Sequence, residues 1–238
     1  MKVLCNYLGG SISYGLDTPL SDKDERFLFL NTEISKIIGL DRHEHESKQT
    51  DGEDKFGWEL RHFLNLLRRG NTACLEMLYN ENWLEITDEF KYIQSLKDEL
   101  VDSDQLYKCL RGYCQSERAL VLGKRTGVLG GKRKEQLEKY GYSYKNAVQF
   151  LRLCLCGQTF FQKGYFPVNI RLVDISGRLM SIKTHPENYS KDDIILLMDD
   201  YEKWLERSYK DVKAKFKYDV DVANDICYKL YVPILINL

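Results

Sequence analysis

Two aspartates placed two residues apart, Asp22 and Asp24, have the type and spacing of a divalent-metal site. Side chains at positions i and i+2 of an extended chain leave the same face, roughly 6 to 7 Å apart along the backbone. Mg²⁺ prefers carboxylate oxygens together with substrate phosphate. Two metals about 4 Å apart can activate an attacking hydroxyl and neutralise leaving phosphates. The pair therefore predicts Mg²⁺- or Mn²⁺-assisted displacement at phosphorus, with a solvated turn as the competing interpretation.

A glycine turn precedes these aspartates. Gly9 and Gly10 follow an apolar, β-favouring run at residues 2–8, and Ser11 comes next. Glycines let the backbone approach a ligand closely, and exposed backbone N–H groups can form an anion nest. A second β-like run covers residues 26–30. Strand, turn and returning strand would thus place a phosphate cradle, made by Gly10 and Ser11, beside the metal ligands.

Three separated segments resemble one family. Residues 10–26 are similar to GSxxYGLxTPxSDxDxR, the pattern of the DNA polymerase beta-like nucleotidyltransferase superfamily, and in particular of its RlaP/YcgL-type predicted nucleotidyltransferase branch. Residues 59–79, ELRHFLNLLRRGNTACLEMLY, and 141–155, GYSYKNAVQFLRLCL, resemble two helices of that branch. The resemblance implies transfer of an NMP group from an NTP to a hydroxyl with release of pyrophosphate. It also implies that Ser11 touches the triphosphate and that Asp22 and Asp24 bind the metals.

The same superfamily normally takes a third carboxylate from a neighbouring strand, to bind the catalytic metal or to accept the proton of the attacking hydroxyl. We favour Asp54, because it opens the segment DKFGW, where a strand parallel to the first hairpin could end. The other acids of this region, Asp51, Glu53 and Glu59, stay open as alternatives. The competing interpretation is a solvated loop, since residues 41–55 are almost entirely polar.

A helix predicted from Ser143 carries a polar stripe. Lys145, Gln149 and Arg152 recur at i, i+4 and i+7 among apolar neighbours. Such a stripe is commonly the solvated face of an amphipathic helix. Beside a site for a polyanionic nucleotide, Lys145 and Arg152 become candidate nucleotide-binding residues. Tyr142 and Tyr144 are candidates for stacking a base.

The segment at residues 123–139 holds six basic and two acidic residues with four glycines. It predicts a mobile basic loop or a frayed helix start that contacts the acceptor. Glu76 lies in an apolar run, where a carboxylate must be paired or hydrogen-bonded.

The predicted fold class is α/β: a small mixed nucleotidyltransferase sheet with flanking helices, followed by a mostly helical C-terminal region. Residues 1–85 would form the catalytic core and residues 86–238 a helical domain that closes the active site. Helical spacing from Glu59, a stop at Gly70, and helix starts at Thr87 and Ser190 support this division.

Charge, cysteine content and the length of the apolar segments exclude several other classes of protein. The 238 residues carry a formal charge of −1, so any basic site must be local. Seven cysteines without a CxxC pair argue against a disulfide framework or zinc ribbon and favour a reducing cytoplasm. No segment has the length of uninterrupted apolar sequence that a membrane span needs, so no membrane partner is expected.

The predicted partners are an NTP and an acceptor, for which an RNA or DNA end is suggested by the branch's association with RNA repair and by the basic segment. A small molecule or a protein hydroxyl is equally compatible with the chemistry. Two alternatives differ in class. One is a non-catalytic nucleotide or nucleic-acid binding module on the same fold. The other is a nucleotidyltransferase that modifies a protein partner, as in toxin–antitoxin or phage-defence pairs.

Overall fold

The computed structural model describes every residue except 20, 41–42, 51–52, 125–130, 213–214 and 237–238. The chain divides into two compact units. We call Met1–Leu106 with Lys215–Leu238 the sheet unit and Tyr107–Ala214 the helical unit. The division of roles predicted for residues 1–85 and 86–238 stays a prediction.

The sheet unit is built on a mixed sheet, with five strands among the described residues. These are β1 (Lys2–Leu8), β2 (Lys23–Leu30), β3 (His45–Thr50), β4 (Glu53–Glu59) and β5 (Glu85–Ile86). Their order is β3-β4-β2-β1-β5. β1 runs antiparallel to β2 and β5, and β3 antiparallel to β4, whereas β2 and β4 are parallel. The predicted mixed α/β class is confirmed.

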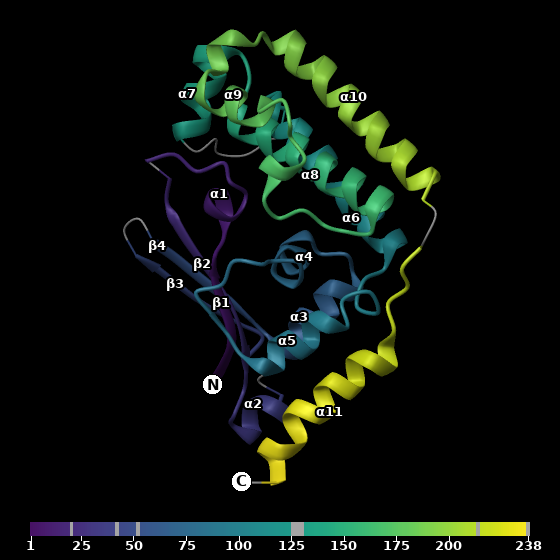
Figure 1. The fold of residues 1–238 in the computed structure, drawn as a ribbon. Coiled ribbons are helices and arrows are strands. Elements are labelled where there is room, and N and C mark those ends of the chain that lie inside the picture. The colour runs from purple at the N-terminus through teal and green to yellow at the C-terminus, as the bar shows by residue number, and fades with distance from the viewer. Residues whose placement is uncertain (20, 41–42, 51–52, 125–130, 213–214, 237–238) are drawn as a thin grey trace. The chain divides into compact units, whose positions relative to one another are not determined.

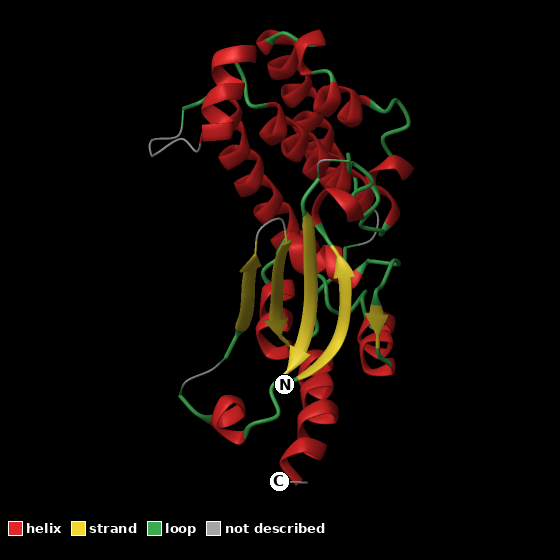
Figure 2. Cartoon of the chain, turned by 90° about the vertical axis from the view of Figure 1, so that its left-hand side faces the viewer, coloured by secondary structure: helices red, strands yellow, loops and turns green. Residues whose placement is uncertain are grey.

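Helices α3, α4 and α5 lie against one face of this sheet (Figures 1 and 2). The helices of the sheet unit are α1 (Gly10–Ser13), α2 (Ile34–Ile38), α3 (Leu60–Arg68), α4 (Thr72–Leu78), α5 (Asp88–Ser95) and α11 (Val220–Ile236). Phe63 and Leu67 of α3, Leu75 of α4 and Phe90 of α5 are fully buried. The helical spacing read from Glu59 onward therefore marks the face that forms the core.

Local signals explain where these helices begin. Asn71 accepts hydrogen bonds from two backbone N–H groups of α4, and Thr87 caps α5 as predicted. Gly70, between α3 and α4, has φ +71. A Cβ there would lie 2.6 Å from the backbone of Leu106, so the turn requires glycine.

The predicted polar loop at residues 41–55 is wrong, because β3 and the start of β4 lie within it. β3 is an edge strand whose side chains are largely exposed, and it pairs with β4 from His45↔Trp58 to Thr50↔Glu53. An exposed edge strand needs no apolar alternation, and charged residues there hinder pairing with another chain. β2 likewise begins at Lys23, three residues before the apolar run that predicted it.

The helical unit packs around α8. It contains most of α6 (Ser103–Val121), then α7 (Gly131–Tyr140), α8 (Tyr144–Lys163), α9 (Arg178–Thr184) and α10 (Lys191–Lys210), with single turns η1 (Ile170–Leu172) and η2 (Pro186–Asn188). A Cβ at Gly157 of α8 would lie 2.5 Å from Leu110 and 2.6 Å from Leu205, so this glycine permits close packing with α6 and α10. Ser190 and Asp193 form the predicted capping box of α10.

The basic segment is partly helical. Residues 131–140 form α7, and residues 125–130 of the segment lie outside the described residues. In the described part of the chain, no helix has the length and apolar character needed to cross a membrane.

Candidate active site

The glycine turn is built against Asp24. The Gly9 backbone N–H donates to the Asp24 carbonyl oxygen at 2.6 Å, where β1 ends beside β2. Gly10 follows with φ +61, and a Cβ on it would overlap the Asp24 carboxylate oxygen Oδ2. Ser11 lies in the short helix α1, partly exposed. The predicted phosphate cradle and the second predicted metal ligand are therefore immediate neighbours.

The parallel register brings a second carboxylate beside Asp24. Asp24 of β2 pairs with Asp54 of β4. Neighbouring strands are about 4.8 Å apart, and residues paired side by side direct their side chains to the same face. Asp54 is exposed and Asp24 is partly exposed. Asp22 is exposed and lies just before the first residue of β2.

Two details differ from the sequence prediction. Asp54 is the second residue of β4, so it lies near the start of the strand, not at its end. Arg26, to which the sequence analysis gave no role, lies beside the pair. Its Nη2 is 3.5 Å from Asp24 Oδ1, and its Nη1 donates to the Glu25 carbonyl at 3.1 Å and the Asp54 carbonyl at 3.5 Å. The sequence does contain a signal for this contact. Arg26 lies two residues after Asp24 on the same strand, so the two side chains leave the same face of the sheet.

The other candidates for the third carboxylate differ from Asp54 in position or burial. Glu53 pairs with Lys23, one position from Asp54, so its side chain leaves the opposite face of the sheet. Asp51 lies outside the described residues. Glu59 is buried and serves as the N-cap of α3, accepting from two backbone N–H groups of that helix and from the Tyr231 hydroxyl. Only Asp54 among the described candidates faces the same way as Asp24.

We expect Asp54→Asn to reduce nucleotidyl transfer by roughly 10²-fold or more, because it removes a general base or metal ligand. Glu53→Gln removes the same charge from the adjacent position of the same strand and should leave transfer within about twofold, since it changes neither function. Initial rates of product formation check both. An equal loss of transfer rate in the two variants would mean that transfer depends on the negative charge of β4 and not on which residue of β4 pairs with Asp24.

Glu59 should affect stability and its dependence on pH. Burial raises the pKa of the Glu59 carboxyl, although Arg61 and the cap hydrogen bonds oppose the shift. A folded-state pKa above the unfolded one means that the folded state binds more protons, so the free energy of unfolding falls as pH rises from about 4 through the raised pKa.

Glu59→Gln should remove the contribution of Glu59 to the pH dependence of stability, measured as the difference from the wild-type chain in urea denaturation across pH 4 to 8, and should leave transfer unchanged. Loss of transfer with an unchanged pH dependence of stability would instead make Glu59 the third carboxylate.

A partly buried hydrogen bond connects the turn to α4. The Tyr14 hydroxyl donates to Glu76 Oε2 at 2.8 Å, which provides the partner that a buried Glu76 requires. Tyr14 is the C-cap of α1, so this contact fixes the helix that carries Gly10 and Ser11.

The remaining predicted residues lie in the helical unit. Lys145 is exposed, in the first turn of α8. Arg152 is buried, and its Nε donates to Gln149 Oε1 at 3.1 Å, so the predicted stripe is not a uniformly solvated face. The carboxylates belong to the sheet unit. The roles of Lys145 and Arg152 toward a nucleotide stay predictions.

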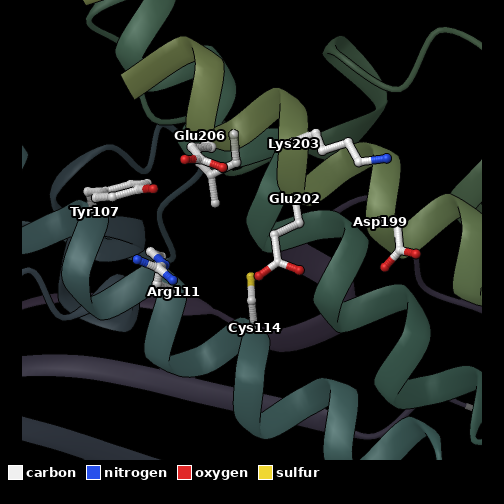
Figure 3. A pocket seen from close by; sticks show the side chains of 8 residues that line it. Tyr107, Arg111, Cys114, Asp199, Glu202, Lys203 and Glu206 are labelled. Carbon is white, nitrogen blue, oxygen red and sulfur yellow. The ribbon is translucent and has the colours of Figure 1, made fainter. Parts of the chain in front are cut away.

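Figure 3 shows a pocket of about 230 Å³ in the helical unit, between α6 and α10. Its acidic residues already have partners: Arg118 binds Asp199 at 2.7 Å and Glu202 at 2.8 Å, and Lys210 binds Glu206 at 2.8 Å. We interpret these pairs as a connection between the two helices. No predicted site residue lines this pocket.

The donor chemistry of the site fits Mg²⁺ or Mn²⁺. Asp22, Asp24 and Asp54 offer the hard oxygen ligands that these ions take. Among the described residues, no three His, Cys, Asp or Glu side chains are gathered closely enough to hold a metal without a substrate. Mg²⁺ is commonly held by one or two carboxylates together with substrate phosphates, which agrees with this arrangement.

Comparison with known proteins addresses the family. A family model described as "RlaP: RNA repair pathway DNA polymerase beta family" matches residues 1–192. This range includes the glycine turn, β2, β4 and α8. The chain belongs to this family. The resemblance found in three sequence segments is thereby confirmed, and membership indicates polymerase beta-like nucleotidyl transfer as the class of activity. No curated protein matches the chain significantly.

Proposed function

We propose that this RlaP-family protein transfers an NMP group from an NTP to the hydroxyl of a polynucleotide end and releases pyrophosphate. The observation that carries the proposal is the pairing of Asp24 with Asp54 in parallel register, beside a turn in which a Cβ on Gly10 would overlap the Asp24 carboxylate. It supports the proposal because the two carboxylates and the glycine turn lie at one end of one strand pair.

Each residue has a proposed task. Ser11 and the backbone N–H groups of the turn hold the terminal phosphates. Asp54 accepts the proton of the acceptor hydroxyl. The hydroxyl oxygen attacks the α-phosphorus and forms a new P–O bond, while the bond from the α-phosphorus to the oxygen of the departing pyrophosphate breaks. For Lys145 and Arg152, which belong to the helical unit, we propose nucleotide binding, as the sequence predicts. Mg²⁺ or Mn²⁺ held by Asp22 and Asp24 would neutralise phosphate charge when bound.

An RNA end is the acceptor that we favour over DNA, a small molecule or a protein. The family's description as part of an RNA repair pathway supports it. The basic residues at the start of α7, Arg133 and Lys134, also fit a phosphate backbone. The seven cysteines, all of them among the described residues, form no disulfide, which fits a reducing cytoplasm.

The reaction is tested by pyrophosphate release. The protein is supplied with each NTP and Mg²⁺ and an unstructured RNA that ends in a free 3′ hydroxyl, or the same RNA ending in a 3′ phosphate. We expect release only with the free hydroxyl. Equal release with both RNAs would contradict a polynucleotide 3′ acceptor.

The phosphate side gives a separate expectation. Ser11→Ala should weaken NTP binding by about 1 to 2 kcal/mol, the scale of one hydrogen bond to a charged group. Lys145→Ala should cost more, because it removes a charge. Isothermal titration measures both, with the exposed residues Ser35 and Lys163 replaced by alanine as matched controls. Unchanged affinity in both test variants would move the phosphate site elsewhere.

A further inference from the structure

A second pocket lies within the helical unit, between α7 and α8. It has a volume of about 250 Å³, near the lower limit of roughly 300 Å³ for small-molecule sites. We call it the α7–α8 pocket. Two tyrosines, two lysines, one amide and one carboxylate line it: Tyr140, Tyr144, Lys139, Lys145, Gln136 and Glu135. Aromatic faces next to cations are the combination that binds unpaired nucleotides.

The tyrosines of this segment have different roles. Tyr142 is buried, and its hydroxyl donates to the Pro186 carbonyl at 2.9 Å, so it belongs to the core. Tyr140 and Tyr144 are partly exposed and line the pocket, with ring centroids 5.9 Å apart and planes at 83°. The prediction that Tyr142 stacks a base is therefore replaced by Tyr140, while Tyr144 remains.

The two lysines are available for an anion. Lys139 and Lys145 are exposed, and neither forms a salt bridge with a carboxylate of the described residues, while the Lys139 ammonium lies 5.0 Å from the centroid of the Tyr140 ring. Glu135 is the one acid of the lining, so the pocket carries a net charge of +1. This differs from the α6–α10 pocket, whose acidic residues are already paired.

Gln136 contributes an amide donor to the lining of the pocket. It is only 7% exposed, and its Oε1 accepts from the Ser143 hydroxyl at 3.0 Å and lies 3.5 Å from the backbone N–H of Lys145. The backbone N–H of Lys145 can only donate, so the amide atom of Gln136 that faces it is the oxygen Oε1, and the nitrogen Nε2 is on the other side. Within the described ranges, no acceptor contacts Gln136 Nε2. Nε2 is not among the buried side-chain atoms that lack a partner in the described residues, so it reaches solvent, where the acceptor atom of a ligand can meet it.

We propose that the α7–α8 pocket binds one unpaired nucleotide, with its base against Tyr140 and Tyr144, its phosphate at Lys139 and Lys145, and an acceptor atom of the base or sugar at Gln136 Nε2. The choice of a nucleotide as ligand rests on the proposed function. The nucleotide comes either from the NTP or from the end of the acceptor strand, and the experiment separates these sources.

The test measures binding by the full chain with Ca²⁺ in place of Mg²⁺, to prevent turnover. Isothermal titration follows each of the four NTPs, and fluorescence anisotropy follows a labelled, unstructured 12-nucleotide RNA. The test variants are Tyr144→Ala, Lys139→Ala and Gln136→Leu. Lys139 is exposed, so Lys139→Ala should leave the core of the helical unit folded.

Two controls match these changes. Lys163→Ala removes a charge from α8, at an exposed residue that does not line the pocket. Tyr228→Ala removes an exposed tyrosine of the sheet unit. Both should change each dissociation constant by less than about twofold, the scale of a surface change.

We expect Tyr144→Ala to raise a dissociation constant by roughly 5- to 150-fold, the range for loss of one base stack. A change for NTPs alone assigns the pocket to the incoming nucleotide, and a change for RNA alone assigns it to the acceptor end. Wild-type affinity of all three variants for both probes overturns the proposal. Loss of binding in a protein that shows no transfer would instead contradict the proposed reaction and leave the pocket assignment standing.

Discussion

Asp24→Asn is expected to reduce nucleotidyl transfer by about 10³-fold or more, because loss of a metal-binding carboxylate removes several kcal/mol of transition-state charge stabilisation. The substitution keeps the side-chain volume, and Asp24 is partly exposed, so the fold should persist. Single-turnover rates measure the loss, and circular dichroism with thermal denaturation checks folding.

Asp17→Asn is the matched control, since Asp17 is an exposed aspartate of the same segment, between the glycine turn and β2. It should retain the wild-type rate within about twofold, as surface substitutions away from a site normally do. If Asp24→Asn keeps a rate near that of Asp17→Asn, the carboxylate pair on β2 and β4 is not the reaction centre.

Gly10→Ala is the second variant with a large expected effect. At φ +61 an alanine is strained, and its Cβ would overlap Asp24 Oδ2, so the carboxylate must move. Displacement of a reacting group by about 1 Å can cost 10²-fold in rate, and we expect a loss of at least that size. The free energy of unfolding should fall by about 1 to 3 kcal/mol.

Gly177→Ala separates strain from overlap. Gly177 has φ +63, but a Cβ there would meet no atom within 4 Å. It should lower the free energy of unfolding by about 1 to 2 kcal/mol, from backbone strain alone, and leave transfer unchanged. Urea denaturation and initial rates compare the two variants. Equal activity in Gly10→Ala and Gly177→Ala would show that the turn does not control Asp24.

Local patterns in the sequence predicted much of this fold. The strand expected at residues 2–8 is β1, Thr87 caps α5, and Ser190 with Asp193 caps α10. These features depend on residues within a few positions of each other, where alternation, turn residues and capping side chains act directly. A strand parallel to the first hairpin was expected to end near Asp54, whereas β4, which is parallel to β2, begins there.

Non-local contacts were beyond such patterns. The C-terminal segment returns to the sheet unit, where the Tyr231 hydroxyl contacts Glu59 and the Tyr218 hydroxyl donates to the Leu64 carbonyl at 3.0 Å. These pairs are more than 150 residues apart in sequence. From the sequence alone, Glu59 therefore resembled any other acid of a polar loop. Its role as N-cap of α3 and its contact with Tyr231 are visible only in the structure. The register Asp24↔Asp54 is non-local in the same way, since strand composition does not fix it.

The central claim is that Asp24 catalyses transfer of a nucleotidyl group to a polynucleotide end. The most direct measurement incubates the wild-type chain and Asp24→Asn with each α-³²P-labelled NTP and Mg²⁺ or Mn²⁺, in the presence of total RNA, total DNA and protein, and then counts label in each separated pool. We predict label in the RNA pool with the wild-type chain and none above background with Asp24→Asn. Label confined to the protein pool, no label in any pool, or equal label from both chains would contradict it.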